Sequence, residues 1–219
     1  MSDVAAGLDE RELEIRLEDV VLRGTLAVPP EPRGLVLFVH GSGSSRFSSR
    51  NRFVAGVING AGIATLLFDL LSPDEERIDQ YSAKLRFDIP LLTQRVIGVT
   101  LWLRDDPSLG VWRLGYFGAS TGAAAALAAA ARLKDIAAVV SRGGRPDLAL
   151  VDLPQVQAPT LLIVGGDDLP VIQMNRQAYA ALETVKELSI VPGASHLFEE
   201  PGTLEEVARL ATAWFEHYL

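Results

Sequence analysis

The sequence predicts an α/β fold in which helices cover both faces of a mainly parallel β-sheet. Two observations support this fold class. Short runs of mainly Val, Ile, Leu or Phe recur along the chain, and they alternate with segments of helical periodicity. Such runs are typical of strands buried on both faces, and their alternation with helices favours a parallel sheet. The expected strands are Leu35–Val39, Ala64–Phe68, Leu114–Phe117, Ile136–Val140, Thr160–Val164 and Leu188–Val191.

The N-terminal segment follows a different pattern. Polar and apolar residues roughly alternate over Glu12–Val20 and again over Leu22–Val28. A period of two is typical of half-buried strands, because successive side chains of a strand point to opposite faces. We therefore expect these two segments to pair as an antiparallel hairpin at one edge of the sheet.

The segments between the strands are expected to be helices. An alanine-rich helix is predicted over Gly122–Leu133, and Thr203 with Glu206 forms a capping-box pattern before the last helix. The charged segment Leu71–Asp88 is interpreted as a solvated loop, with a partial lid as the alternative. Helical spacing of three and four joins Leu92, Val96, Val99 and Leu103, and also Leu204, Val207, Ala211, Trp214 and Tyr218.

Composition excludes several classes of protein. The 219 residues are 48% hydrophobic and 22% charged, which is typical of a globular chain and predicts a single domain over residues 1–219. A net charge of −8 without a basic run argues against a nucleic-acid partner. The absence of cysteine excludes a disulfide, a thiolate nucleophile and a cysteine-ligated metal.

Two further segments bear on location. Met1–Glu10 lacks the apolar core of a signal peptide, and the longest strongly apolar stretch, Gly122–Ala131, is about half a membrane span. We therefore expect a cytoplasmic protein without a membrane partner, either a monomer or a homodimer.

Residues with catalytic chemistry follow the expected strands. In an open parallel sheet, ligands bind beyond the carboxyl ends of the strands. A serine, an acid and a histidine are found in the loops that reach this edge. The loops are His40–Ser44, Asp69–Leu70, Gly118–Gly122, Ser141–Arg145, Gly165–Asp168 and Gly193–His196.

Ser120 is the candidate nucleophile. The run Gly118–Gly122 fits the G-x-S-x-G pattern, lies after an expected strand and precedes the alanine-rich helix. This is the sequence context of a sharp strand-to-helix turn that exposes a serine hydroxyl. The flanking glycines provide the space that such a turn requires.

The base and the acid are expected to follow the serine along the chain. His196 fits the base, whereas His40 comes too early and is interpreted as a loop-shaping residue, and His217 is expected to be solvent-exposed. Asp167 and Asp168 both follow the strand before His196. We favour Asp168 as the acid that orients the imidazole, with Asp167 as the alternative.

A developing oxyanion requires hydrogen-bond donors near the serine. The expected donors are the backbone N–H of Thr121, directly after the nucleophile, and that of Ser42, in the His-Gly-Ser-Gly loop. Gly43 leaves room there for a substrate carbonyl.

Together these motifs resemble the α/β-hydrolase superfamily, from Leu35 to the final helix. Within it, the segments His40–Arg46 and Ser141–Pro146 are similar to those of the dienelactone-hydrolase-like group. Dienelactone hydrolases proper use a cysteine nucleophile, so the resemblance implies a variant with a serine nucleophile. Only Ser141–Pro159 separates the two strands between which many relatives insert a cap, so no separate cap domain is expected.

The resemblance implies a serine hydrolase that cleaves carboxylic esters or lactones through an acyl-enzyme, without a metal or an organic cofactor. The alternatives are an acyltransferase or perhydrolase on the same triad, and a ligand-binding module without turnover. Arginines also crowd the catalytic edge. The functional hypothesis is that Arg142, with or without Arg46, binds a substrate carboxylate. We favour the structural alternative, in which these arginines pair with acids such as Asp69 or Asp147 and hold the loops in place.

Overall fold

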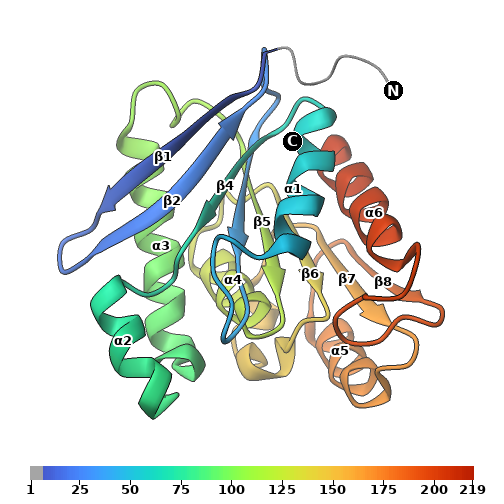
Figure 1. The fold of residues 1–219 in the computed structure, drawn as a ribbon. Coiled ribbons are helices and arrows are strands. Elements are labelled where there is room, and N and C mark those ends of the chain that lie inside the picture. The colour runs from blue at the N-terminus through green and yellow to red at the C-terminus, as the bar shows by residue number, and fades with distance from the viewer. Residues whose placement is uncertain (1–6) are drawn as a thin grey trace.

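The computed structural model describes residues 7–219, so most of the Met1–Glu10 segment lies outside the described residues. These residues form one eight-stranded sheet in the order β1-β2-β4-β3-β5-β6-β7-β8 (Figure 1). The strands are β1 (Asp9–Arg16), β2 (Val21–Val28), β3 (Leu35–Val39), β4 (Ala64–Phe68), β5 (Leu114–Ala119), β6 (Ala138–Arg142), β7 (Thr160–Gly165) and β8 (Lys186–Val191).

The sheet is parallel from β4 to β8, and its N-terminal edge is antiparallel. β1 pairs with β2, and β2 pairs with β4, both in antiparallel register. The remaining neighbours run parallel. The predicted fold class and the edge hairpin are confirmed.

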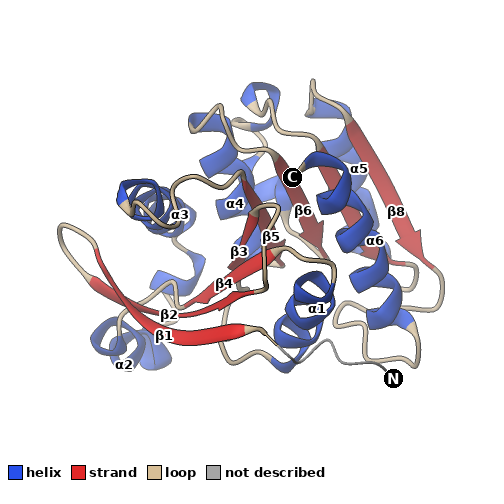
Figure 2. Cartoon of the chain, turned by 90° about the horizontal axis from the view of Figure 1, so that it is seen from above, coloured by secondary structure: helices blue, strands red, loops and turns tan. Residues whose placement is uncertain are grey.

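Helices lie on both faces of the sheet. Figure 2 shows α1 and α6 on one side, and α3, α4 and α5 on the other. The α-helices are α1 (Ser49–Gly60), α2 (Pro73–Ser82), α3 (Ile89–Asp105), α4 (Thr121–Arg132), α5 (Leu169–Ala181) and α6 (Thr203–Tyr218), and the short 3-10 helices are η1 (Leu85–Phe87), η2 (Pro146–Ala149) and η3 (Leu153–Gln155).

The apolar strands divide their side chains between two cores. In β3, Leu35 and Leu37 pack with α3 and α4, whereas Val36 and Phe38 pack with α1 and α6. Phe38 stacks on Phe117 of β5 with ring centroids 4.7 Å apart. A parallel strand covered on both faces therefore requires the continuous apolar runs seen in the sequence.

Two local predictions are wrong. Residues 71–88 form α2 and η1 rather than a solvated loop, because Ser72 and Glu75 make a capping box around Pro73. The α2–η1 turn is fixed by Asp79, which is fully buried and accepts bonds from Arg86 and from the Leu85 N–H.

The capping box predicted for α6 is also absent. Gly202 occupies the N-cap position with φ of 82°, and the Thr203 hydroxyl donates to the Glu200 carbonyl at 2.7 Å instead. The turn that enters the helix needs a left-handed residue, which glycine supplies without a steric penalty. Among the described residues, no helix is both long and apolar enough to cross a membrane.

Candidate active site

Ser120 lies at the sharp turn between β5 and α4. Its φ of 50° and ψ of −122° belong to a region that residues with a side chain rarely adopt. A Cβ on Gly118 would lie 2.4 Å from Ala123 Cα, and one on Gly122 would lie 2.3 Å from the His40 carbonyl oxygen. The close approach of strand, turn and helix thus requires both glycines of the motif.

The backbone of Ser120 is held by the neighbouring strand. Its N–H donates to the Arg142 carbonyl at 3.2 Å, and its own carbonyl accepts from the Arg145 N–H at 3.0 Å. A strained residue persists only where its surroundings fix it in place. β6 therefore serves as the support of the turn.

His196 is oriented by Asp168. The His196 Nδ1 lies 2.7 Å from the Asp168 Oδ2. The carboxylate accepts the Nδ1–H, which leaves Nε2 unprotonated in the neutral ring and available as a base. Asp167 is exposed and makes no contact of this kind, so the structure brings Asp168 rather than Asp167 to the histidine.

The ends of β7 and β8 hold this pair together. A Cβ on Gly165 would lie 2.3 Å from the Ala194 carbonyl oxygen, so the two chain segments touch at that point. The Ser195 N–H donates to the Glu200 carboxylate at 3.0 Å, which fixes the turn that carries His196. Asp168 occupies the N-cap position of α5 but makes no capping bond, because its carboxylate is directed to the imidazole.

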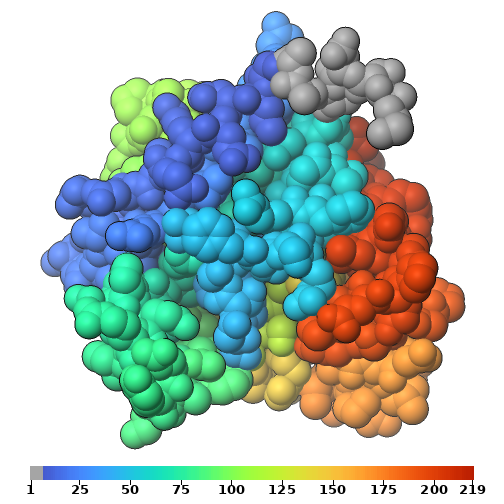
Figure 3. Space-filling view, viewed as in Figure 1, coloured from blue at the N-terminus to red at the C-terminus, as the bar shows by residue number. Residues whose placement is uncertain are grey.

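Ser120 and His196 line one cavity of about 270 Å³. Among residues 7–219 no hydrogen bond joins the serine hydroxyl to the imidazole. Such bonds are often long before substrate binds. Figure 3 is coloured by residue number, so green and yellow atoms belong to the middle of the sequence. They are visible between the blue loop that follows β3 and the red segment that precedes α6. The other residues of the cavity wall are Gly41, Ser42, Ser44, Ser48, Arg50, Asn51, Ala119, Arg142 and Leu197.

The two residues expected to supply the oxyanion donors contact each other. Thr121 opens α4, where the first backbone N–H groups have no partner within the helix. The Ser42 N–H donates to the Thr121 hydroxyl at 2.9 Å. A substrate oxygen at this position would have to share that N–H with the hydroxyl or displace it.

His40 links two loops of the catalytic edge. It is buried, its Nδ1 lies 2.9 Å from the Gly41 carbonyl oxygen, and its Nε2 accepts from the Leu70 N–H at 3.1 Å. Burial lowers the pKa of His40, which favours the neutral ring that this bonding pattern needs. His217 is exposed on α6.

Arg142 is a buried cation in the wall of the same cavity. Its exposed fraction is 6%, its Nη2 donates to the Asn51 Oδ1 at 3.0 Å, and its guanidinium lies 5.9 Å from the ring centroid of Phe198. Burial, together with the nearby Arg50 cation, lowers the pKa of Arg142 to about 10, so the side chain stays charged at neutral pH. Among the residues described, none of the ion pairs includes Arg142.

Arg46 is placed elsewhere. Its guanidinium pairs with Asp69 and, at 3.1 Å, with Glu12, and its backbone N–H also donates to Asp69 at 2.8 Å. It lines a separate cavity of about 190 Å³. The structure therefore does not bring Arg46 to Ser120. Arg46 instead pairs with an acid, Asp69, as the structural alternative predicts. Arg145 likewise pairs with Asp147.

Sequence reasoning missed two residues around Arg142. Asn51 comes from α1 and is 3% exposed, and Phe198 is buried with a left-handed φ of 56°. Neither has a local motif that marks it. Only the packing of α1 and of the segment between β8 and α6 near the end of β6 brings them to Arg142.

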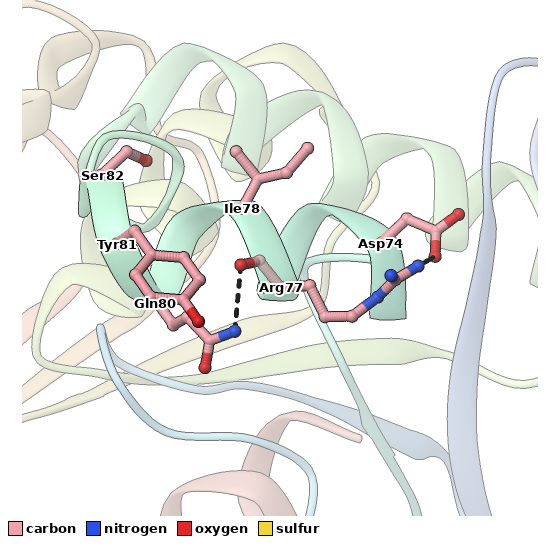
Figure 4. A pocket seen from close by; sticks show the side chains of 6 residues that line it. All are labelled: Asp74, Arg77, Ile78, Gln80, Tyr81 and Ser82. Carbon is pink, nitrogen blue, oxygen red and sulfur yellow. Dashed lines mark hydrogen bonds and ion pairs between the residues drawn. The ribbon is translucent and has the colours of Figure 1, made fainter.

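A further hollow on the outer face of α2 is a poor candidate for the site. Figure 4 shows that all its labelled residues come from this one helix, with Arg77 directed to Asp74 and Gln80 to the Arg77 carbonyl. The two charged side chains of this hollow, Arg77 and Asp74, form an ion pair with each other. Within residues 7–219, no group of three or more acidic or histidine side chains is arranged to hold a metal ion.

Comparisons with known proteins identify the family and the fold. The sequence model of the Dienelactone hydrolase family matches residues 63–218. A crystal structure of dienelactone hydrolase from Anabaena variabilis is 57% identical, covers 97% of this chain and 99% of that chain, and has a TM-score of 0.95. Est1E from Butyrivibrio proteoclasticus, at 16% identity with 97% and 99% coverage and a TM-score of 0.75, shares the fold.

A longer relative comes from Mycobacterium tuberculosis. It is 55% identical over 213 residues, which are 97% of this chain and 47% of that protein, and it carries the provisional name phosphoribosyl transferase. The chain therefore spans about half the length of the curated relatives it matches. The family match covers most of the chain, and the eight-stranded sheet agrees with that of the family's fold. The chain belongs to the dienelactone hydrolase family and has its α/β-hydrolase fold.

Proposed function

We propose that this chain is a serine hydrolase that cleaves carboxylic esters or lactones through an acyl-enzyme. One observation carries the proposal. Ser120 is held in a strained turn and shares a cavity with His196, which Asp168 orients through Nδ1. A serine exposed on such a turn, with an oriented imidazole nearby, is the arrangement that activates a hydroxyl for attack on a carbonyl.

Acylation starts with attack of the Ser120 Oγ on the substrate carbonyl carbon. His196 Nε2 takes the hydroxyl proton, and Asp168 stabilises the imidazolium that forms. The carbonyl π electrons move to oxygen, where the N–H groups of Thr121 and Ser42 stabilise the negative charge. When the tetrahedral species collapses, the bond to the leaving alcohol breaks and His196 returns the proton to it.

Deacylation repeats these steps with water. His196 removes a proton from the water molecule, the oxygen attacks the acyl carbon, and the Ser120 ester bond breaks as the proton returns to Oγ. The products are a carboxylic acid and the free enzyme. In a lactone the leaving alcohol stays attached to the acyl group, so the product is a single hydroxy acid.

Arg142 supports a preference for anionic esters. It is buried in the cavity wall, stays charged at neutral pH and has an amide rather than an acid as its hydrogen-bond partner. A guanidinium binds a carboxylate through two parallel hydrogen bonds. We therefore propose that substrates with a free carboxylate are preferred over neutral esters of equal size.

The two alternative functions use the same site. An acyltransferase or perhydrolase would pass the acyl group to an acceptor other than water, and a binding module would not react at all. The transferase name stays with the longer relatives, because this chain matches only about half of each.

The test compares wild type with Ser120→Ala on a panel of p-nitrophenyl esters and lactones. We expect the variant to keep its fold and to lose about a thousandfold to a millionfold in kcat, with the residual rate due to the oxyanion donors and binding. A variant that keeps a tenth of the wild-type rate would show that Ser120 is not the nucleophile.

A further inference from the structure

Arg142 is a buried, charged side chain that has no acidic partner among residues 7–219. Its guanidinium donates a hydrogen bond to the Asn51 amide oxygen. The Phe198 ring lies further away, with its centroid 5.9 Å from the guanidinium carbon. Removing a charge from water is unfavourable unless an opposite charge compensates it. Asn51 accepts a hydrogen bond from the guanidinium, but a neutral amide contributes no compensating charge.

The surroundings of this pair are also positive. Asn51 lies in the first turn of α1, and Ser48, Arg50 and Asn51 all line the cavity, so the N-terminus of the helix is at its wall. The first turn of α1 contains no acidic residue, although acids are favoured there by the helix dipole. None of the described residues that line the cavity is acidic.

Arg50 adds to this positive potential. Its only ion pair in the described chain is with Glu199 at 3.3 Å, and 63% of the Glu199 side chain is exposed. Solvent weakens such a pair, so Glu199 compensates little of the charge inside the cavity. The wall that faces Ser120 thus combines two guanidiniums and one helix N-terminus.

We propose that Asn51 determines the charge specificity of this site. It holds the Arg142 guanidinium in place by a hydrogen bond and leaves its charge free for an anionic group of the substrate, either a carboxylate or a phosphate-type group. An aspartate at this position would have nearly the same size and accept the same bond, but would form an internal ion pair. The inference rests on the proposed hydrolysis of esters, and it adds the residue that sets substrate charge.

The key variant is therefore Asn51→Asp. It is compared with Ser49→Asp, which adds the same charge to the first turn of α1 at an exposed position. Two substrates are anionic: mono-p-nitrophenyl succinate, which has a free carboxylate, and the p-nitrophenyl carboxylic ester of 3-phosphonopropionic acid. The third, methyl p-nitrophenyl succinate, is neutral. The readout is the ratio of kcat/KM for each anionic ester to that for the neutral ester.

We expect wild type to prefer at least one anionic ester by about tenfold or more, which is the size of one charge-assisted hydrogen bond. Asn51→Asp should reduce that ratio to about one, and Ser49→Asp should keep most of it. The larger of the two anionic ratios identifies the group that the site takes. A wild-type ratio retained by Asn51→Asp, or lost equally in Ser49→Asp, would overturn the proposal.

Asn51→Ala separates charge control from a merely structural role. It removes the hydrogen bond but leaves the cation, so the ratio should still favour the anionic ester while KM rises. If Asn51 only stabilises α1, Asn51→Ala and Asn51→Asp should weaken activity on charged and neutral esters to the same degree.

Binding of product-like anions distinguishes failure of this inference from failure of the proposed function. Succinate and inorganic phosphate are titrated into wild type and Asn51→Asp, and the melting temperature is recorded. At least one anion should stabilise wild type and not Asn51→Asp, whether or not any ester is hydrolysed. Equal shifts in both proteins, or none in wild type, would contradict the role of Asn51.

Discussion

The two sides of the catalytic edge differ in whether their most buried arginine has an acidic partner. On the side of β4, α2 and η1, Arg46 pairs with Asp69, Arg86 with the buried Asp79, and Arg95 with Glu75. On the side of α1, β6 and β8, Arg142 donates to an amide and has no acid partner within the described residues. One side uses cations to fix segments, and the other keeps a cation available beside the nucleophile.

This difference separates stability from chemistry. An arginine that already forms an ion pair with a carboxylate stabilises the folded state, and its charge is not available to bind an anionic ligand. A buried arginine without one is unfavourable for folding alone and gains most when an anion binds. Substitutions on the paired side should therefore change stability, and those on the side of the cavity should change catalysis.

After Ser120→Ala, the largest effect is expected at Asp168. Asp168→Asn should lower kcat by about a thousandfold to ten-thousandfold, because the amide favours the wrong imidazole tautomer. Asp167→Asn is the matched control, since its side chain is exposed one residue away and does not contact His196. Steady-state kinetics on one p-nitrophenyl ester measure both. A larger loss in Asp167→Asn would move the triad acid by one residue.

A smaller effect distinguishes the two arginines that the sequence singled out. Arg142→Met should lower the ratio of kcat/KM for anionic over neutral esters by about tenfold or more, whereas Arg46→Met should leave it unchanged.

In wild type the same ratio should fall as the pH rises toward about 10, the lowered pKa of Arg142, because the guanidinium then loses its charge.

Stability should show the reverse order. Arg46→Met leaves the partly buried Asp69 without its partner, so the free energy of unfolding in urea should fall by about 1 kcal/mol or more. Arg142→Met removes a buried, uncompensated charge and should be close to neutral or stabilising. Equal losses of stability in both variants would show that the two sides do not differ in this way.

The sequence predicted most of the fold because each parallel strand is marked by its own continuous apolar run. It also predicted the serine turn, since both glycines are required locally by contacts that a Cβ would break. Residues 71–88 were misjudged as a loop, because their many charges concealed the helix; most of them are exposed, as expected. In the structure, the capping box starts a helix and Asp79 is buried by its own local bonds.

Which arginine reaches the cavity could not be predicted. Arg46 meets Asp69 only because β3 and β4 are neighbours, and Arg142 meets Asn51 only because α1 packs near the end of β6. Both contacts are tertiary, and no local motif indicates them. The choice between Asp167 and Asp168 likewise depends on how β7 turns into α5.

The central claim, that Ser120 is an activated nucleophile, is tested most directly by labelling with a fluorophosphonate. The intact mass of the protein is measured before and after reaction, and the modified peptide is located by mass spectrometry. We predict one adduct on wild type, located at Ser120, and none on Ser120→Ala. No adduct on wild type, or an adduct at another residue, would contradict the claim.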